Sequence, residues 1–505
     1  MAAREWREAS DLRTSALTIG VVLVAATLLR FWALDAGLPF AVGSDEPILM
    51  EPVVQAVKTG TFAPRRADHG GALFYAQALT ASARFLAGAR DGRWSSLNET
   101  DPHDYYLWSR RLTALLGVAT IFLVYAIGRR WGGRHALLAA GLMTVMPPHV
   151  SASHYVLVDV PLVFLVTLTA LLALRASERA RLADFGWAGL VAGLAASLRL
   201  VGGAALLLPL LATWMTLEAS PSRLRCALAS LGAFAAGFVL GMPLSVLDPP
   251  SFLNAVAALA AGPAGTSAPP AGWLLNLADL RDGMGWPALI LAGSGLVLGS
   301  VRAIKGPGRV RWTLAVVFPL VFLYILASGS GNDDRAILPV LPFTCLLAAS
   351  AVVSGVSLLR RFDIPRTPRT TLIVALTVAS LVVPSVAAIQ LDRRLGRRTT
   401  LAQAYDWVLR EIPPGAAIAV GTRAPWLPPD RYAVLPLERR PPAVESSART
   451  TVAGYLLCAG DDGTDARGDC GSTVGMTELA VFEPSVDHPG PQLHVYVRAA
   501  SSTRR

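Results

Sequence analysis

Charged residues are scarce in this chain. Asp, Glu, Lys and Arg make up only 16% of the 505 residues, whereas 53% are hydrophobic and the mean hydropathy is +0.48. A soluble domain of ordinary composition carries about 25% charged residues, so this composition excludes that class. We therefore predict an integral membrane protein whose solvent is the lipid bilayer.

Acidic residues are the rarer of the two signs, with 35 Asp and Glu against 45 Lys and Arg. The resulting net charge of +10 could suggest a nucleic-acid partner. The Arg residues recur between apolar segments, however, where they orient a membrane protein by the positive-inside rule. No nucleic acid is therefore expected as a partner. An A-x-A-like cleavage site is also missing after residues 15–34, so we predict an uncleaved first span there.

Apolar segments long enough to cross about 30 Å of hydrocarbon recur as far as residue 389. If the N-terminus is cytoplasmic, the inner loops between them are all rich in Arg, as the positive-inside rule requires. We therefore predict a bundle of about eleven spans with the C-terminus outside. The predicted spans are residues 15–34, 112–127, 136–146, 156–174, 187–198, 201–217, 226–247, 284–301, 312–327, 336–359 and 372–389.

One further apolar segment, residues 71–87, is also long enough to span. Counting it would place every later Arg-rich loop outside, and it carries Gln77 and Arg84. We predict an interfacial or re-entrant helix instead. The first outer segment then runs from about residue 35 to residue 110.

The sequence Gly43-Ser44-Asp45-Glu46-Pro47 lies within this outer segment, just after the first span. Two adjacent carboxylates at the edge of a bilayer make Asp45 and Glu46 the first catalytic candidates. The structural alternative is a helix start, with Ser44 or Asp45 as the N-cap, Pro47 in the first turn and the carboxylates facing the helix dipole. Residues 48–57 would continue as an amphipathic helix lying on the membrane, kinked at Pro52.

A second group of polar residues surrounds the start of the fourth span. Asp159 opens that span, and a carboxylate entering a membrane usually faces a cavity or an ionic partner. We therefore treat Asp159 as a functional candidate, with a structural ion pair as the alternative. His149 and His154 precede it in the same outer loop, where a histidine is more often a surface or capping residue than a ligand.

Arg199 lies between two short spans that meet at the outer face. A lone Arg at that depth needs an anion, which is either a protein carboxylate or a lipid phosphate. Gly202 and Gly203 favour the phosphate, because glycine allows close backbone approach. Asp334 and Arg335 are likewise charged residues on the outer side of a span, the tenth, where a hydrated turn is the alternative.

The order of these motifs resembles the C-fold (GT-C) glycosyltransferases, over roughly residues 10–390. The closest groups are the protein O-mannosyltransferases, the lipid A aminoarabinose transferases and the Rgt-like transferases of bacteria. The features that carry the resemblance are the Asp45-Glu46 pair, Gly60-Thr61-Phe62, an Arg-Leu opening the second span, Tyr155 through Asp159-Val160-Pro161, the stretch from Gly193 to Arg199, and Asp334-Arg335 before Leu338-Pro339-Val340-Leu341-Pro342.

The resemblance implies a transferase that takes a sugar from a polyprenyl-phosphate carrier and passes it to a glycan, lipid or protein acceptor outside the membrane. Asp45 matches the essential acid, which deprotonates or orients the acceptor, and Glu46 and Asp159 would support it. Arg199, Arg335 and His154 would meet the carrier phosphate or substrate. The expected location is the inner (plasma) membrane of a bacterium.

One motif departs from the family. Relatives often carry Lys-Pro or His-Pro-Pro before the outer helix, whereas this chain has Asp68-His69-Gly70-Gly71. His69 would still be a substrate-binding candidate, although a turn made with the glycines is an equal alternative. A divalent cation held by Asp45, Glu46 and Asp159 is left open, because scattered carboxylates without fixed spacing are no metal signature.

The composition changes after residue 391. Residues 401–412 predict an amphipathic helix, and residues 416–420, 451–457, 478–482 and 493–497 predict strands. Residues 392–505 are therefore expected to form a small mixed α/β domain outside the membrane, after a transmembrane domain of residues 1–391. Cys458 and Cys470 both fall in the outer domain, where an oxidising compartment favours a disulfide over two free thiols.

The fold class predicted is thus an all-α polytopic membrane bundle with a small extracytoplasmic α/β domain. A transporter is the rival from another class, but the internal repeats with matched broken helices that transporters often show are not found in the sequence. A protein that binds the lipid carrier without transferring a sugar is the remaining alternative. It would keep Arg199 and need no acid pair.

Overall fold

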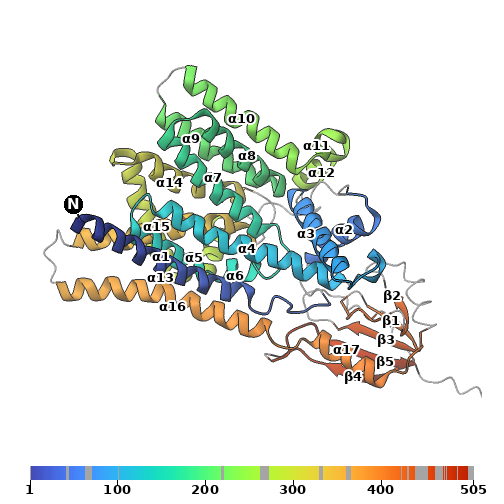
Figure 1. The fold of residues 1–505 in the computed structure, drawn as a ribbon. Coiled ribbons are helices and arrows are strands. Elements are labelled where there is room, and N and C mark those ends of the chain that lie inside the picture. Colours follow the sequence, from blue (N-terminus) through green and yellow to red (C-terminus); the bar gives the residue numbers. More distant parts are fainter. Residues whose placement is uncertain are drawn as a thin grey trace, which may run out of the picture. The chain divides into compact units, whose positions relative to one another are not determined.

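The computed structural model describes residues 2–40, 45–62, 71–100, 102–217, 221–261, 272–328, 334–359, 366–421, 423–428, 431–437, 453–460, 470, 473, 475–485 and 487–498. The chain divides into two compact units, shown in Figure 1. The first unit comprises Met1–Leu34 and Asp45–Leu391, and the second comprises Asp35–Ser44 and Asp392–Arg505. The division after Leu391 is where the sequence predicts it, while Asp35–Ser44 groups with the second unit.

Helices make up the first unit, and they follow the predicted apolar segments. In chain order they are α1 (Ala2–Phe31), α2 (Glu46–Thr59), α3 (Gly71–Arg90), η1 (Leu97–Glu99), α4 (Pro102–Gly128), α5 (Gly133–Thr144), α6 (Pro147–Ala152), α7 (Asp159–Arg179), α8 (Leu182–Leu198), η2 (Leu200–Leu206), α9 (Leu207–Thr216), α10 (Pro221–Gly241), α11 (Leu244–Leu247), α12 (Pro249–Ala261), α13 (Gly272–Lys305), α14 (Arg309–Ala327), η3 (Asp334–Val340), α15 (Leu341–Leu359) and α16 (Arg366–Leu395). The η elements are 3₁₀ helices.

Each predicted span overlaps one of these helices or two consecutive ones. In the described part of the chain, seven helices are long and apolar enough to cross a membrane, and α1, α8 and the η2–α9 stretch are shorter apolar helices. The segment predicted as the third span forms α5, whose 12 residues rise only about 18 Å. The protein is therefore an integral membrane protein, and the number of eleven spans stays a prediction.

Close contact between α8 and α10 depends on glycine. A Cβ atom added to Gly193 would lie 2.0 Å from the carbonyl oxygen of Phe234, and one added to Gly237 would lie 2.1 Å from that of Leu190. Neither position has room for a side chain, so the two backbones meet directly. Small residues allow this kind of approach in membranes, where dispersion contacts drive helix association.

The helix predicted to lie on the membrane packs inside the protein instead. Met50, Val53, Val54 and Val57 of α2 are all buried, and α2 packs against α3. The amphipathic pattern was correctly assigned to a helix, but α3 supplies the apolar surface that the bilayer was expected to supply.

The second unit contains a mixed five-stranded sheet of order β2-β1-β3-β5-β4. β1 is parallel to β2 and β3, whereas β5 is antiparallel to β3 and β4. The elements are α17 (Thr400–Glu411), β1 (Ala417–Val420), β2 (Ala433–Pro436), β3 (Tyr455–Ala459), β4 (Met476–Phe482) and β5 (Leu493–Arg498).

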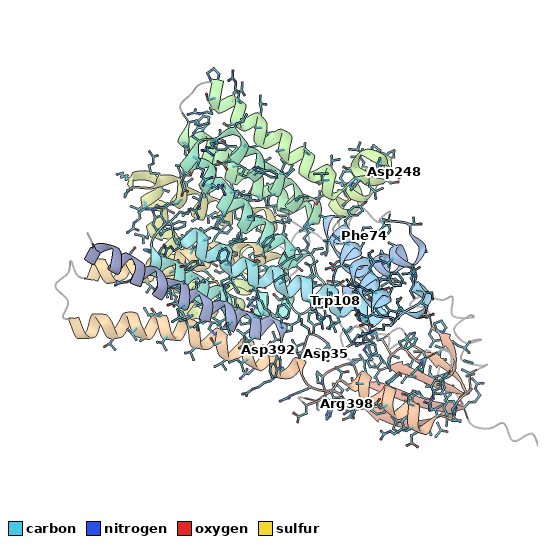
Figure 2. The ribbon with its side chains drawn as sticks, viewed as in Figure 1. Asp35, Phe74, Trp108, Asp248, Asp392 and Arg398 are labelled. Carbon is cyan, nitrogen blue, oxygen red and sulfur yellow. A yellow bond between two sulfur atoms is a disulfide. The ribbon has the colours of Figure 1, made fainter. Side chains whose placement is uncertain are left out.

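A hydrophobic core joins α17 to one face of this sheet. Leu401, Ala404 and Val408 recur at helical spacing and pack with Leu457 and Val495. Thr399 caps the helix by accepting a hydrogen bond from the backbone N–H of Ala402. The C-terminal sheet unit therefore has its own core, as its amphipathic helix and strands predict, and its side chains are drawn in Figure 2.

A disulfide joins Cys458 on β3 to Cys470. The two other cysteines, Cys226 and Cys345, are buried free thiols in the helical unit. The pairing is the one that the sequence predicts for an oxidising compartment.

Candidate functional site

Asp45 immediately precedes α2 and presents its carboxylate to solvent. It occupies the N-cap position, but its side chain makes no capping hydrogen bond. The carboxylate instead forms an ion pair with Arg335 on η3, and the two side chains are 43% and 31% exposed. The helix-start alternative therefore explains the backbone position of Asp45 and not the direction of its side chain.

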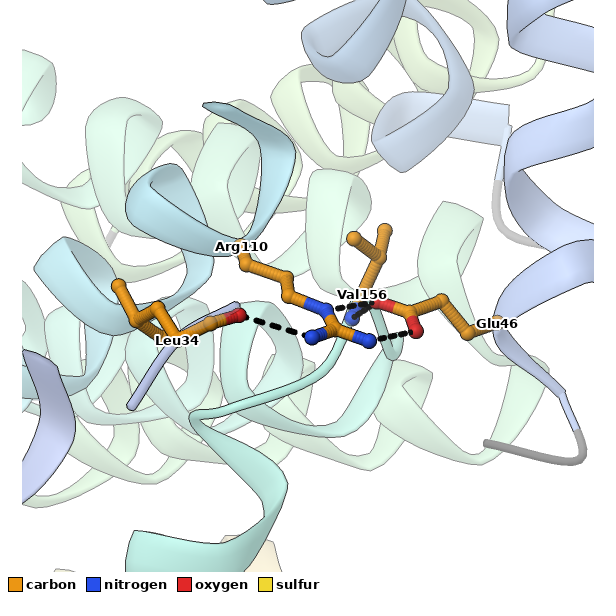
Figure 3. Close-up of polar contacts among 4 residues, drawn as sticks. All are labelled: Leu34, Glu46, Arg110 and Val156. Carbon is orange, nitrogen blue, oxygen red and sulfur yellow. Dashed lines mark hydrogen bonds and ion pairs between the residues drawn. The ribbon is translucent and has the colours of Figure 1, made fainter. Parts of the chain in front are cut away.

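Glu46, the next residue, has the opposite environment. Its side chain is fully buried and lies against Arg110 of α4, which is also buried. Nε of Arg110 donates to Oε1 of Glu46 at 2.7 Å, and Nη2 donates to Oε2 at 2.5 Å (Figure 3). This bidentate pairing fixes the orientation of both groups, because the planar guanidinium matches the carboxylate.

The Glu46–Arg110 pair also holds two loops. Nη1 of Arg110 donates to the carbonyl oxygen of Leu34, at the end of the first span, at 2.8 Å (Figure 3). The backbone N–H of Val156, in the loop before α7, donates to Oε1 of Glu46 at 3.0 Å. The ring of Tyr155 covers Arg110, with the guanidinium carbon 5.2 Å from the ring centroid. One buried ion pair thereby connects the end of the first span and the loop before α7 to the start of α2, next to Asp45.

Asp159, at the start of α7, is buried and paired with Arg199. Nη1 of Arg199 donates to Oδ1 of Asp159 at 3.2 Å, and about a third of the Arg199 side chain remains exposed. Of the two anions that the sequence allows for Arg199, the structure provides the protein carboxylate. The remaining exposed surface leaves Arg199 able to contact a phosphate as well.

The glycines beside Arg199 have a different use from the one expected. A Cβ atom added to Gly202 would lie 2.4 Å from the carbonyl oxygen of Ala195. Gly202 is therefore needed for packing of η2 against α8. The phosphate beside Gly202 and Gly203 stays a prediction.

His154 does not fit the substrate-binding role predicted for it. The residue is 1% exposed, and its Nδ1 lies 2.8 Å from the carbonyl oxygen of Val150. Burial lowers the pKa of His154, so the ring stays neutral inside the protein. A neutral, enclosed imidazole cannot supply positive charge to a phosphate.

His149 is buried in the same loop, beside Arg30 from the end of α1. Nη2 of Arg30 lies 3.0 Å from Nδ1 of His149, which accepts the hydrogen bond. Arg30 also donates to the carbonyl oxygens of Met143 and Thr144. Burial, together with the Arg30 charge, holds the pKa of His149 well below its ordinary value. These groups fix the loop rather than contact a ligand.

His69 lies outside the described residues. The divalent cation that the sequence leaves open at Asp45, Glu46 and Asp159 finds no common set of ligands in these three residues, because each carboxylate is paired with a different arginine. In the described part of the chain, no group of three or more His, Cys, Asp or Glu side chains is arranged to hold a metal.

Sequence reasoning missed Arg110 as a functional residue. An Arg near the start of a span is similar to the signal that singled out Arg199, although Arg110 is followed directly by Arg111. In the sequence, Arg110 served only to mark the end of the first outer segment, and no function was assigned to it. Tyr155 was noted only as part of the family resemblance, and its contact with Arg110 could not be predicted because the two residues lie far apart in the sequence.

The profile of the dolichyl-phosphate-mannose-protein mannosyltransferases (PMT) matches residues 72–242. This range includes Arg110, Asp159 and Arg199, and it begins after Asp45 and Glu46. No curated protein matches the chain significantly in sequence.

Solved structures share the architecture at low sequence identity. ArnT from Cupriavidus metallidurans bound to undecaprenyl phosphate matches with a TM-score of 0.52 and 14% identity, over 96% of this chain and 98% of that one. The oligosaccharyltransferase of Archaeoglobus fulgidus in the apo form matches with a TM-score of 0.54 and 12% identity, over 88% of this chain. The chain has the GT-C glycosyltransferase fold.

This GT-C chain spans only part of the archaeal enzymes. It covers 69% of the apo oligosaccharyltransferase and 58% of AglB from the same organism, solved with an inhibitory peptide and a dolichol-phosphate (TM-score 0.51, 13% identity, 79% of this chain). It is nearly equal in length to ArnT.

Proposed function

We propose that this protein is a membrane glycosyltransferase that moves a sugar from a polyprenyl-phosphate carrier to an acceptor at the extracytoplasmic face. The observation that carries the proposal is the exposed Asp45 carboxylate, held by Arg335 within a GT-C fold. Two structures with this fold contain undecaprenyl phosphate and a dolichol-phosphate, which supports a polyprenyl-phosphate carrier.

Sugar transfer requires one bond to form at the anomeric carbon and one to break. The acceptor hydroxyl attacks that carbon, its proton passes to a base, and the carrier phosphate leaves with the bonding electrons. Asp45 is the proposed base or orienting group, because it is exposed and lies next to a fixed scaffold. Arg199 and Arg335 are the proposed cations that stabilise the negative charge growing on the phosphate.

Glu46 has a supporting role in this proposal. Its carboxylate is enclosed and fully engaged by Arg110 and the Val156 N–H, so it cannot take a proton from an acceptor. It positions Asp45 and the loop that leads to Asp159. Asp159 in turn orients Arg199. No step is assigned to a divalent cation, because the paired carboxylates do not form a site for one.

The proposal is tested by the substitution Asp45→Asn, with Asp282→Asn as a matched control. Asp282 is exposed on α13 and pairs with its neighbour Arg281. Mass spectrometry of glycolipids, polysaccharides and glycoproteins should reveal a product in cells with the wild-type or Asp282→Asn protein. Cells with Asp45→Asn should lack it, although the variant inserts normally and binds undecaprenyl phosphate.

Two outcomes would overturn the assignment. Near-normal product from a well-folded Asp45→Asn protein would remove Asp45 from the reaction. Identical glycan profiles in cells with and without the gene, combined with carrier binding by the purified protein, would favour a carrier-binding or transport protein.

A further inference from the structure

A cluster of cationic and aromatic side chains lies where the α4–α5 turn meets the α13–α14 turn. The guanidinium carbon of Arg302 lies 4.9 Å from the centroid of the Trp312 ring, and that of Arg311 lies 5.9 Å from the centroid of the Trp131 ring. The two indoles meet edge to face at 5.5 Å. Two guanidinium groups thus converge on one pair of aromatic rings, which we call the Arg302/Arg311 cluster, together with His135.

Positive charge in the Arg302/Arg311 cluster is not balanced by protein carboxylates. Over the described ranges, no Asp or Glu lies within ion-pair distance of Arg302, Arg311 or His135. Burial and the two guanidinium groups lower the pKa of His135, which precedes the apolar part of α5. By contrast, the neighbouring Arg130 forms an ion pair with Glu178 at 3.1 Å.

Two hydrogen-bond donors in this cluster are buried without an acceptor. These are Nε of Arg311 and Nε1 of Trp131, neither of which donates to any described group. A buried N–H group that stays unpaired is costly, so native proteins normally provide it with a partner. Both atoms can only donate, and beside two guanidinium groups the partner that suits them is an anionic oxygen.

Two observations favour a lipid phosphate over a free one. Arg110 near one end of α4 is about 28 Å along the helix axis from Arg129 just beyond its other end, so the α4–α5 turn lies about the thickness of a bilayer's hydrocarbon core away from the Glu46–Arg110 pair beside Asp45. Tryptophan is enriched at the depth of lipid headgroups. Exposed apolar side chains at Val297, Val301 and Ile304 of α13 lead along that helix to Arg302 and provide a surface for acyl chains.

We propose that the Arg302/Arg311 cluster binds the phosphate of an anionic phospholipid headgroup. Basic pockets between transmembrane helices recognise such headgroups by charge and hydrogen bonding. This inference does not depend on sugar transfer, because it uses none of the residues assigned to that reaction.

Native mass spectrometry of the full chain in detergent tests the proposal. Phosphatidylglycerol, phosphatidylcholine with the same acyl chains, and inorganic phosphate are titrated separately. We expect the wild-type protein to retain phosphatidylglycerol in preference to phosphatidylcholine. The double variant Arg302→Gln/Arg311→Gln should bind phosphatidylglycerol roughly tenfold more weakly or worse. The matched control Arg179→Gln/Arg225→Gln removes two exposed arginines from other turns and should bind like the wild type.

Equal phosphatidylglycerol affinity in the wild type and the double variant would overturn the proposal. Displacement of the lipid by inorganic phosphate at equal concentration would overturn the lipid assignment and identify a soluble phosphate as the ligand. If the double variant does not fold, Trp131→Phe decides, because it removes only the Nε1–H donor. A weaker affinity in that variant supports the proposal, and an unchanged affinity overturns it.

Discussion

Asp45 and Glu46 are adjacent in the sequence, yet their carboxylates pair with different arginines in different environments. Asp45 is exposed and pairs with Arg335, whereas Glu46 is enclosed and pairs with Arg110. Asp45 is therefore the carboxylate available for chemistry, and Glu46 is the carboxylate that holds the local structure in place. This division of roles leads to the first of four predictions.

Replacing Glu46 by Gln should destabilise the protein by about 3–5 kcal/mol, because the charge of Arg110 would remain buried without its partner. Glu51→Gln on the same helix, where Glu51 is exposed, provides the matched control and should have little effect. Thermal unfolding of both purified variants in detergent measures the difference. The double variant Glu46→Gln/Arg110→Met should recover part of the lost stability. Equal unfolding temperatures for Glu46→Gln and Glu51→Gln would contradict this interpretation.

Arg199→Ala should weaken the binding of undecaprenyl phosphate by about tenfold, since one charge-assisted contact is lost. Arg199→Lys should retain part of the affinity, because a point charge replaces the guanidinium fork. Titration of the carrier into each purified variant provides the measurement. Identical affinities for the three proteins would restrict Arg199 to its pairing with Asp159.

Gly193→Ala should destabilise the α8–α10 contact by about 3 kcal/mol, because the new methyl group would meet the backbone of α10. The controls are Gly186→Ala on α8 and Gly232→Ala on α10, where nothing lies within 4 Å of the added atom. The yield of folded protein and its unfolding temperature should fall for Gly193→Ala alone. A similar loss in all three variants would show that the close backbone contact at Gly193 is not the cause.

Cys470→Ser should destabilise the sheet unit by roughly 3 kcal/mol, which the chain-entropy model assigns to closing a loop of this size. The two cysteines are 12 residues apart. Thiol labelling and non-reducing peptide mapping of native membranes should find Cys458 and Cys470 bridged. Free thiols in the native protein would argue against an oxidising compartment for this unit, and with it against the predicted sidedness.

Periodicity and charge sufficed to predict the elements but not their partners. Long apolar segments predicted the main membrane helices but not α6 or α12, and short strand-like segments predicted β1, β3, β4 and β5, because each signal is local. β2 (Ala433–Pro436) was not predicted, since its four residues pair with β1 and carry little pattern of their own.

The candidate site shows the same limit. Its acidic residues could be found because charges are conspicuous in an apolar chain. The arginine that pairs with each acid could not be predicted, because Glu46 and Arg110 are 64 residues apart and no local rule relates them. The sequence therefore left open whether Asp45, Glu46 and Asp159 share a cation, and it did not show that each pairs with a different arginine.

The two acids before Pro47 are also distinguished by the length of their side chains. Glutamate has one methylene more than aspartate, and Glu46 uses that reach to place both oxygens on the Arg110 fork. An exchanged order would leave a shorter acid in the enclosed position and a longer one in solvent. The sequence Asp-Glu is therefore specified as an ordered pair, and a chain with Glu-Asp would keep the charge while losing the geometry.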